Sequence, residues 1–200
     1  MFDAALRRLI DPALSHAARA AAATGVSANT LTIGGALIGL VGAFAISQQQ
    51  FVAGLVFVLI NRTLDGFDGA VARIAGPTEF GGYLDTLADF VFYVSVPVAF
   101  GLAAPDNLLP ALLLVASFTL TAVSFLGFAA IAARSGKKDG GHGPKALIYS
   151  TGLMEGGETI AFFILFCLFP AYFEQLALLF AALCIVTVMQ RIILAAKSFR

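Results

Sequence analysis

Four aspartates within 25 residues carry the chemistry that this sequence suggests. Asp65 and Asp68 are three residues apart, and Asp85 and Asp89 are four residues apart. On an α-helix both spacings place two side chains on one face, about 5–6 Å apart between Cβ atoms. Carboxylates crowded together in apolar surroundings repel one another and lose hydration, so they require cations. The pattern therefore predicts a site for divalent metal ions where two neighbouring helices bring the pairs together.

The elements that position these pairs are predicted to lie in a membrane. Of the 200 residues, 60% are apolar and only 12% are charged, whereas about a quarter of the residues of a soluble domain are charged. Apolar runs long enough to cross ~30 Å of hydrocarbon indicate six transmembrane helices, at roughly 31–47, 51–74, 81–104, 108–133, 150–170 and 172–196. The second and third runs carry the four aspartates.

The first 25 residues differ from these runs. Asp3, Asp11 and Pro12 interrupt any hydrophobic region of the kind that a cleaved signal peptide needs. Apolar residues recur there at helical spacing, which predicts a helix in the membrane interface, although an amphipathic helix packed on the bundle fits equally well. We therefore expect an all-α integral membrane protein with one domain over residues 1–200, consisting of an amphipathic interfacial helix (1–25) and a six-helix bundle (26–200).

Lys and Arg indicate how the chain is oriented. With the N-terminus inside, all 12 basic residues fall on the cytoplasmic side or on helix ends that face it, and the opposite side carries Asp106 and Glu174. The positive-inside rule then predicts that both termini and the aspartates face the cytoplasm. We expect the membrane to be a bacterial inner membrane.

The residues around the aspartates match a known pattern. The segment resembles the signature of the CDP-alcohol phosphotransferase (CDP-alcohol phosphatidyltransferase) family, Asp-x-x-Asp-Gly-x-x-Ala-Arg followed, after a spacer, by Gly-x-x-x-Asp-x-x-x-Asp. The matching positions are Asp65, Asp68, Gly69, Ala72, Arg73, Gly81, Asp85 and Asp89. The number of spans and the chain length also look like the core domain of the family, so the resemblance covers essentially the whole chain.

This resemblance implies a role for each position. Members of the family bind two divalent cations, usually Mg²⁺ or Mn²⁺, and the implied ligands here are Asp65, Asp68, Asp85 and Asp89, with Asp89 also the general base. The implied contacts to the cytidine nucleotide are Asp65, Gly69, Ala72, Arg73 and Thr78, together with Asn29 and Thr32 in the segment that begins the first span. The spacer before Gly81 is slightly shorter than the family usually has, which loosens the alignment of Thr78.

The resemblance implies transfer of a substituted phosphate group from a CDP-alcohol to a small acceptor alcohol in phospholipid biosynthesis, with release of CMP. CDP-diacylglycerol is the expected donor. The chemistry is physically reasonable, because two cations neutralise charge on a pyrophosphate and a positioned base activates the attacking hydroxyl. The family also implies a homodimer surrounded by membrane lipid, and no nucleic acid is expected as a partner.

The sequence leaves the acceptor alcohol open. A phosphorylated acceptor such as glycerol 3-phosphate needs a cationic pocket, for which Arg134, Lys145 and Arg191 are candidates, and this favours a phosphatidylglycerophosphate-synthase-like reaction. Glu155 and Glu158 would repel a phosphate unless they pair with Arg134 or Arg191, and they could instead bind hydroxyls or an amine.

Several alternatives therefore stay open. Serine, inositol or inositol phosphate could be the acceptor, or CDP-choline or CDP-ethanolamine could donate to a lipid alcohol. A cation transporter is the alternative outside the enzyme class, because carboxylates in a membrane often mark ion pathways. The outer halves of the predicted spans, however, have almost no polar groups.

Overall fold

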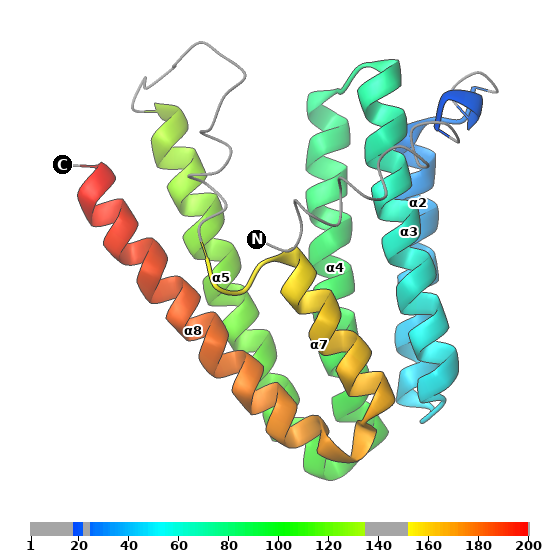
Figure 1. The fold of residues 1–200 in the computed structure, drawn as a ribbon, viewed down its shortest axis with the longest axis vertical. Helices are drawn as coiled ribbons and strands as arrows, with labels where there is room; N and C mark the ends of the chain where they lie inside the picture. The colour runs from blue at the N-terminus through cyan, green and yellow to red at the C-terminus, as the bar shows by residue number, and fades with distance from the viewer. Residues whose placement is uncertain (1–17, 22–24, 135–151, 200) are drawn as a thin grey trace.

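The computed structural model describes residues 18–21, 25–134 and 152–199, and all the regular structure in these ranges is helical (Figure 1). The long helices are α2 (Ala28–Ser47), α3 (Phe51–Ala75), α4 (Glu79–Ala103), α5 (Leu108–Arg134), α7 (Gly156–Leu168) and α8 (Phe173–Ser198). Two 3₁₀ turns, η1 (Pro105–Asn107) and η2 (Pro170–Tyr172), precede α5 and α8. The predicted all-α class is confirmed for the described residues.

Four of these segments are long and apolar enough to cross a membrane, so the chain is an integral membrane protein. They are Ala28–Ser47, Glu79–Ala103, Pro105–Arg134 and Pro170–Ser198. The other two predicted spans are also helical, but α3 carries Arg62, Asp65, Asp68 and Arg73, and α7 has only 13 residues. The predicted interfacial helix over residues 1–25 lies mostly outside the described residues.

The helices form two groups that share α4. On one side α2 packs against both α3 and α4, and on the other side α5 packs against α8 and α4. The short helix α7 packs against α3, and Figure 1 shows it in front of α4, starting part of the way down the bundle. The end of α3 and the start of α4 lie together at the upper end of Figure 1.

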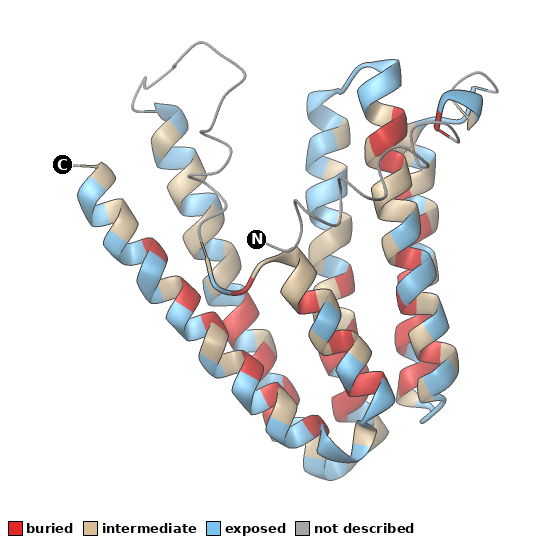
Figure 2. Ribbon diagram, viewed as in Figure 1, coloured by how far each residue is buried: buried red, intermediate tan, exposed pale blue. Residues whose placement is uncertain are grey.

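Phenylalanine rings tie α4 and α5 to α8. The ring of Phe100 on α4 stacks on that of Phe173 at the start of α8, with the centroids 4.6 Å apart. Phe118 of α5 meets Phe180 of α8 edge-on at 5.1 Å, and each aromatic pair of this kind adds about 0.5–1.5 kcal/mol to what burial alone contributes. Figure 2 shows that buried residues concentrate in the middle and lower parts of the bundle. The upper ends of the helices are less buried, except for the last turns of α3, which carry the buried Asp68, Ala70 and Val71.

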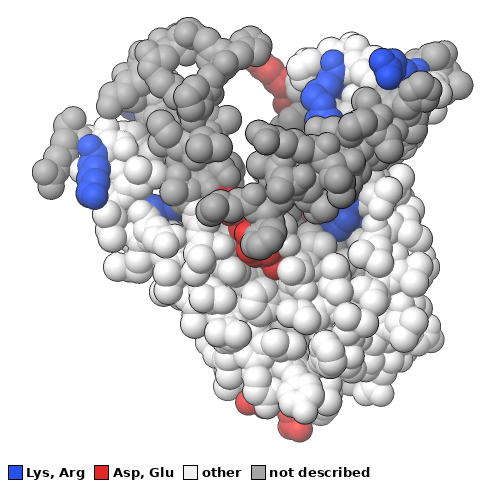
Figure 3. All heavy atoms as spheres, in the orientation of Figure 1, with Lys and Arg blue, Asp and Glu red and all other residues white. Residues whose placement is uncertain are grey.

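Charged residues are distributed unevenly between the two ends of the bundle. Arg73, Arg134 and Lys197 lie in the last turns of α3, α5 and α8, and Figure 3 shows basic side chains toward the upper end. Asp106 in η1 and Glu174 in the first turn of α8 lie at the opposite end, where Figure 3 shows acidic side chains.

Glycines on α2 allow its neighbours to come close. A Cβ atom built on Gly42 would lie 2.7 Å from Cβ of Phe57 on α3, and one built on Gly39 would lie 2.9 Å from Cδ2 of Phe92 on α4. Real Cβ atoms do not approach other atoms so closely, so these two positions require glycine. Small residues commonly permit close helix packing in membranes, and here they bring α3 and α4 onto one face of α2.

We expect Gly42→Ala to lower the unfolding temperature of the protein in detergent, because overpacking a tight contact costs about 1–3 kcal/mol. The matched control is Gly34→Ala on the same helix, where an added Cβ would have no neighbour within 4 Å. Equal unfolding temperatures for the two variants would contradict the close packing of α2 against α3.

Candidate active site

A short turn brings the two aspartate pairs face to face. Helix α3 ends at Gly76, which has a positive φ of 97° that glycine adopts readily. Thr78 then caps α4, its hydroxyl oxygen accepting a hydrogen bond of 3.0 Å from the amide of Gly81. Asp65 and Asp68 consequently lie near the end of α3, beside the first turns of α4 that carry Asp85 and Asp89.

Asp68 is the most buried of the four aspartates, with 4% of its surface exposed. The hydroxyl of Thr32 on α2 donates to its Oδ2 at 2.6 Å. A hydrogen bond to a carboxylate is stronger than one between neutral groups, so this contact offsets part of the loss of hydration. The sequence singled out both residues, and the structure brings them together from positions 36 apart in the chain.

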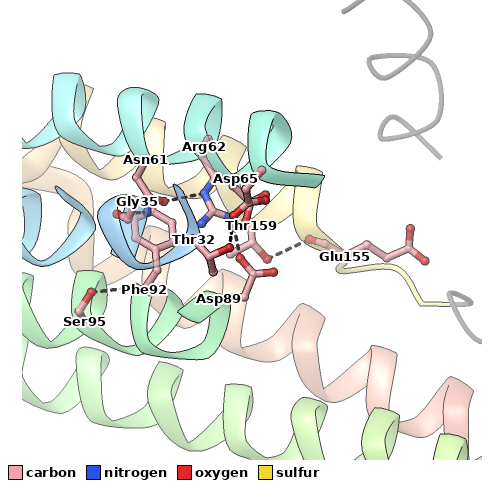
Figure 4. A network of polar contacts seen from close by, with 11 residues as sticks. Thr32, Gly35, Asn61, Arg62, Asp65, Asp89, Phe92, Ser95, Glu155 and Thr159 are labelled. Atoms are coloured by element: carbon pink, nitrogen blue, oxygen red, sulfur yellow. Dashed lines mark hydrogen bonds and ion pairs between the residues drawn. The ribbon is translucent and has the colours of Figure 1, made fainter. Parts of the chain in front are cut away.

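Arg62 joins Asp65 and Asp89, as Figure 4 shows. Its Nη1 donates to Oδ1 of Asp89 at 2.9 Å and lies 3.7 Å from Oδ2 of Asp65. Its Nε donates to Oδ1 of Asn61 at 2.7 Å, and Asn61 in turn donates to the backbone oxygen of Gly35 on α2 at 2.8 Å. One chain of hydrogen bonds thus connects α2, α3 and α4 and ends on Asp89.

Neither Arg62 nor Asn61 belongs to the aspartate signature. One signal for Arg62 was present, because it stands three residues before Asp65 and therefore shares its helix face. Both residues line a small hollow between the helices, together with Thr32, Gly35, Ala36, Asp65, Asp68 and Ala88. The hollow contains three of the predicted site residues and both of the missed ones.

Several candidate nucleotide contacts meet at the same end of the bundle. A Cβ built on Gly81 would lie 2.9 Å from Oγ1 of Thr78 and 3.1 Å from Oδ1 of Asn29, so these residues of α2 and α4 are neighbours. A Cβ on Gly69 would lie 3.5 Å from Nη1 of Arg73. Arg73 and Thr78 are exposed, which leaves them accessible to a ligand that enters from this end.

The four carboxylates fit divalent cations by chemical type, since Mg²⁺ and Mn²⁺ prefer oxygen ligands. As the side chains lie, no three His, Cys, Asp or Glu residues in the described part of the chain converge as metal ligands. Asp68 is bonded to Thr32 and Asp89 to Arg62, while Asp85 is exposed. A cation could therefore be bound once these side chains rotate toward one another.

Arg191, a candidate for the acceptor pocket, lies inside the bundle with 9% of its surface exposed. Its Nη1 donates to the backbone oxygen of Thr121 on α5 at 2.9 Å and lies 3.3 Å from Oγ of Ser124. Its Nε is buried and has no hydrogen-bond partner among the described residues. Buried donors are rarely left unpaired, so this nitrogen is a candidate contact for a ligand.

The other acceptor candidates are placed differently. Glu155 and Glu158 form a capping box at the start of α7, in which Oε2 of Glu158 accepts from the amide of Glu155 at 3.3 Å. Figure 4 shows Glu155 to the right of the aspartates, where its backbone oxygen accepts a hydrogen bond of 2.9 Å from the hydroxyl of Thr159. Arg134 is exposed at the end of α5, and Lys145 lies outside the described residues.

The sequence matches a known family and is similar to proteins from other organisms. A family model described as CDP-alcohol phosphatidyltransferase matches residues 25–196. Inner membrane protein YnjF of Escherichia coli is 42% identical over 193 residues, which are 96% of this chain and 94% of that protein. Archaetidylinositol phosphate synthase of Pyrococcus horikoshii is 34% identical over 100 residues, 49% of this chain and 52% of that protein.

Solved structures of Mycobacterium tuberculosis phosphatidylinositol phosphate synthase (PgsA1) share the fold. The crystal structure with CDP-DAG bound has a TM-score of 0.70 at 22% identity, covering 90% of this chain and 91% of that one. The crystal structure in complex with manganese and citrate has a TM-score of 0.71 at 21% identity, covering 90% and 88%. At this level of identity the likeness concerns the fold.

We expect Thr32→Val to lower the free energy of unfolding in EDTA by about 1–3 kcal/mol, because it removes the hydroxyl that satisfies the buried Asp68 carboxylate. The comparison variant is Thr63→Val, since Thr63 is exposed and donates only to the backbone oxygen of Leu59, at 2.8 Å. Thermal unfolding of both variants measures the difference. Equal losses would mean that the contact with Asp68 contributes nothing to stability.

Proposed function

The chain belongs to the CDP-alcohol phosphatidyltransferase family, and from that premise we propose which donor and acceptor it uses and which residues act. The family assignment made from the aspartate signature is confirmed. The protein is a transferase of substituted phosphate groups that works in phospholipid biosynthesis by transfer from a CDP-alcohol. CDP-diacylglycerol is the proposed donor, and a phosphorylated small alcohol is the proposed acceptor.

Two observations support CDP-diacylglycerol. A protein of the same fold has been solved with CDP-DAG bound, and the candidate site lies at one end of an apolar bundle whose outer surface is rich in exposed Leu, Ile, Val and Phe side chains. The acyl chains would remain among the lipid beside the helices. The cytidine diphosphate would lie at the polar end, on Asn29, Thr32, Asp65, Gly69, Ala72, Arg73 and Thr78.

Two divalent cations, Mg²⁺ or Mn²⁺, are proposed at Asp65, Asp68, Asp85 and Asp89. Manganese in a solved protein of the same fold supports a divalent cation. When bound, the cations would neutralise the pyrophosphate and stabilise the leaving CMP. The carboxylates come from two helices that both pack on α2, so the geometry of the site depends on how α2 holds α3 and α4.

Asp89 is proposed as the general base as well as a ligand. Its carboxylate would accept the proton of the acceptor hydroxyl as that oxygen attacks the phosphorus farther from cytidine. A bond forms between the acceptor oxygen and this phosphorus, the bond from the phosphorus to the bridging oxygen breaks, and CMP leaves. Arg73, with its fork of donors, is suited to hold the phosphates of the donor.

The observation that carries the acceptor proposal is the buried guanidinium of Arg191. A buried cation whose Nε has no partner among the described residues suits an anionic group better than a neutral alcohol, because a phosphate would satisfy both its charge and its donor. The negative charge of Glu155 partly offsets the positive charge of Arg191, but Glu155 makes no hydrogen bond to its Nε. Arg134 and Lys145 are proposed as further basic groups near the acceptor, and Glu155 and Glu158 as residues that bind its hydroxyls.

Glycerol 3-phosphate is the leading acceptor, which makes the reaction phosphatidylglycerophosphate-synthase-like. Inositol phosphate is the second candidate, and the similarity to an archaetidylinositol phosphate synthase favours it. Serine is the third, since CDP-diacylglycerol–serine O-phosphatidyltransferase of Helicobacter pylori is 38% identical over 70 residues.

The membrane arrangement proposed for the whole chain has six spans, with α3 and α7 in the membrane beside the four apolar segments. Both termini and the active site would face the cytoplasm of a bacterium, consistent with the basic residues at that end of the helices. We propose one domain over residues 1–200, with residues 1–25 in the interface. A homodimer is proposed from the family resemblance.

We expect purified protein with Mn²⁺ and CDP-diacylglycerol to release CMP with glycerol 3-phosphate from a panel that also holds inositol phosphate, inositol, serine and ethanolamine. EDTA should stop the reaction and Mg²⁺ or Mn²⁺ should restore it. CMP release only with a neutral alcohol or an amine would contradict the phosphorylated acceptor.

Controls for this assay are Asp68→Asn and Asp89→Asn, which keep the size of the side chain but remove a charge. Both should remain folded in detergent and release no CMP. Turnover at the wild-type rate in either variant would rule out its proposed role in the metal site.

We expect Arg191→Ala to raise the KM for the acceptor by about tenfold or more, since a lost hydrogen bond to a charged group is worth about 1.5–3 kcal/mol. The KM for the donor should change little. Lys197→Ala, at an exposed position on the same helix, is the control and should change neither. Equal increases in both KM values would make Arg191 a structural residue.

A further inference from the structure

We propose that Arg62 is a built-in counter-ion of the active site, which a divalent cation must displace from Asp89 and Asp65 in order to bind. The inference rests on the metal site proposed above, and it concerns a residue outside the aspartate signature. Arg62 would keep the acidic side chains compensated between catalytic cycles. It would also set how tightly the site holds its cations.

The first observation is where the guanidinium lies. Nη1 of Arg62 is 2.9 Å from Oδ1 of Asp89 on α4 and 3.7 Å from Oδ2 of Asp65 on α3. One positively charged nitrogen therefore stands between two carboxylates that belong to different helices and that are both proposed as metal ligands. A divalent cation held by these two carboxylates would need that space.

The second observation is that Arg62 is held in place by contacts other than the aspartates. Its Nε donates to Asn61, whose own amide is fixed on the backbone of Gly35 and which is 2% exposed. The guanidinium carbon also lies 4.3 Å from the centre of the Phe92 ring and 5.7 Å from that of Tyr93. Cation–π contact with the face of an aromatic ring stabilises a guanidinium.

The packing of α2 provides the room for this arrangement. A Cβ on Gly39 would lie 2.9 Å from Cδ2 of Phe92 and 3.0 Å from Nδ2 of Asn61. A larger residue at position 39 would push away both groups that seat Arg62. The seat is thus built by three helices, and it would keep Arg62 within the site after the bond to Asp89 is broken.

Electrostatics then require an exchange. The guanidinium and a divalent cation on the same pair of carboxylates would repel each other strongly, because the site is partly buried and its effective dielectric is below that of water. A bound metal ion would replace the guanidinium as the partner of the Asp89 carboxylate. Arg62 would then keep its contacts with the rings of Phe92 and Tyr93. The apparent affinity for metal is lowered by the free energy needed to break the ion pair.

The test is a titration of the purified full-length protein in detergent with Mn²⁺ alone, followed by electron paramagnetic resonance of the free ion. We expect Arg62→Gln to bind Mn²⁺ about tenfold more tightly than wild type, as a typical coupling free energy between two sites would give. Its unfolding temperature in EDTA should be lower than that of wild type. The rise in that temperature on adding Mn²⁺ should be larger.

Two further variants sharpen the result. Arg62→Lys keeps the charge but loses the Nε bond to Asn61 and the flat stacking on Phe92, so its affinity should fall between wild type and Arg62→Gln. If Arg62→Gln cannot be purified in EDTA, the Lys variant against wild type decides the question by the same ordering. Lys197→Gln, at an exposed position in the last turn of α8, should leave Mn²⁺ binding unchanged.

Weaker or unchanged Mn²⁺ binding in the Arg62 variants would overturn the exchange, and weaker binding would show that Arg62 supports a metal ligand. These outcomes leave the proposed metal site intact. Absence of Mn²⁺ binding in the wild-type protein would overturn both the exchange and the metal site. The wild-type titration therefore separates the two failures before any variant is compared.

Discussion

The structure depends on one constraint, which is that the negative charge of its partly buried carboxylates must be compensated. Four aspartates lie where two helices approach each other in a largely apolar bundle, and burial of an unpaired anion is costly. Each of the two best-described contacts brings in a group from elsewhere in the chain, with Thr32 donating to Asp68 and Arg62 to Asp89. The site is therefore assembled by the packing of α2, α3 and α4, and any change in that packing alters how the negative charge is balanced.

The two groups of helices pack in different ways, and this difference helps to keep α2, α3 and α4 in the positions that the acidic site needs. Glycines on α2 permit the close approach of α3 and α4, whereas rings such as Phe100, Phe173 and Phe180 tie α4 and α5 to α8 with large, rigid apolar contacts. A closely packed interior has few voids and is hard to compress, so the packed rings limit how far the helices around the acidic site can move. Helix α8 supplies Arg191, a buried cation on a helix that carries none of the four aspartates.

With the proposed phosphorylated acceptor, this transferase would bind two anionic substrates in the same small volume. The separation of charges in the described residues is suited to that task, because the acidic group on α3 and α4 can take cations and a pyrophosphate, while the basic group on α8 can take a second phosphate. Arg62 adds a resident positive charge to the acidic group. The balance between this arginine and divalent cations would couple metal binding to the geometry of Asp89, the proposed base.

The helical class, the membrane environment and the aspartate signature followed from the sequence, because apolar runs and spacings of three or four residues are properties of a single helix. The count of six spans is not confirmed, because four segments of the described residues are long and apolar enough to cross a membrane, whereas α3 carries four charged residues and α7 is only 13 residues long. Sequence patterns did not indicate that Arg62 reaches Asp89, 27 residues away, or that Thr32 reaches Asp68, 36 residues away. These contacts depend on which faces of α2, α3 and α4 meet, and only tertiary packing decides that.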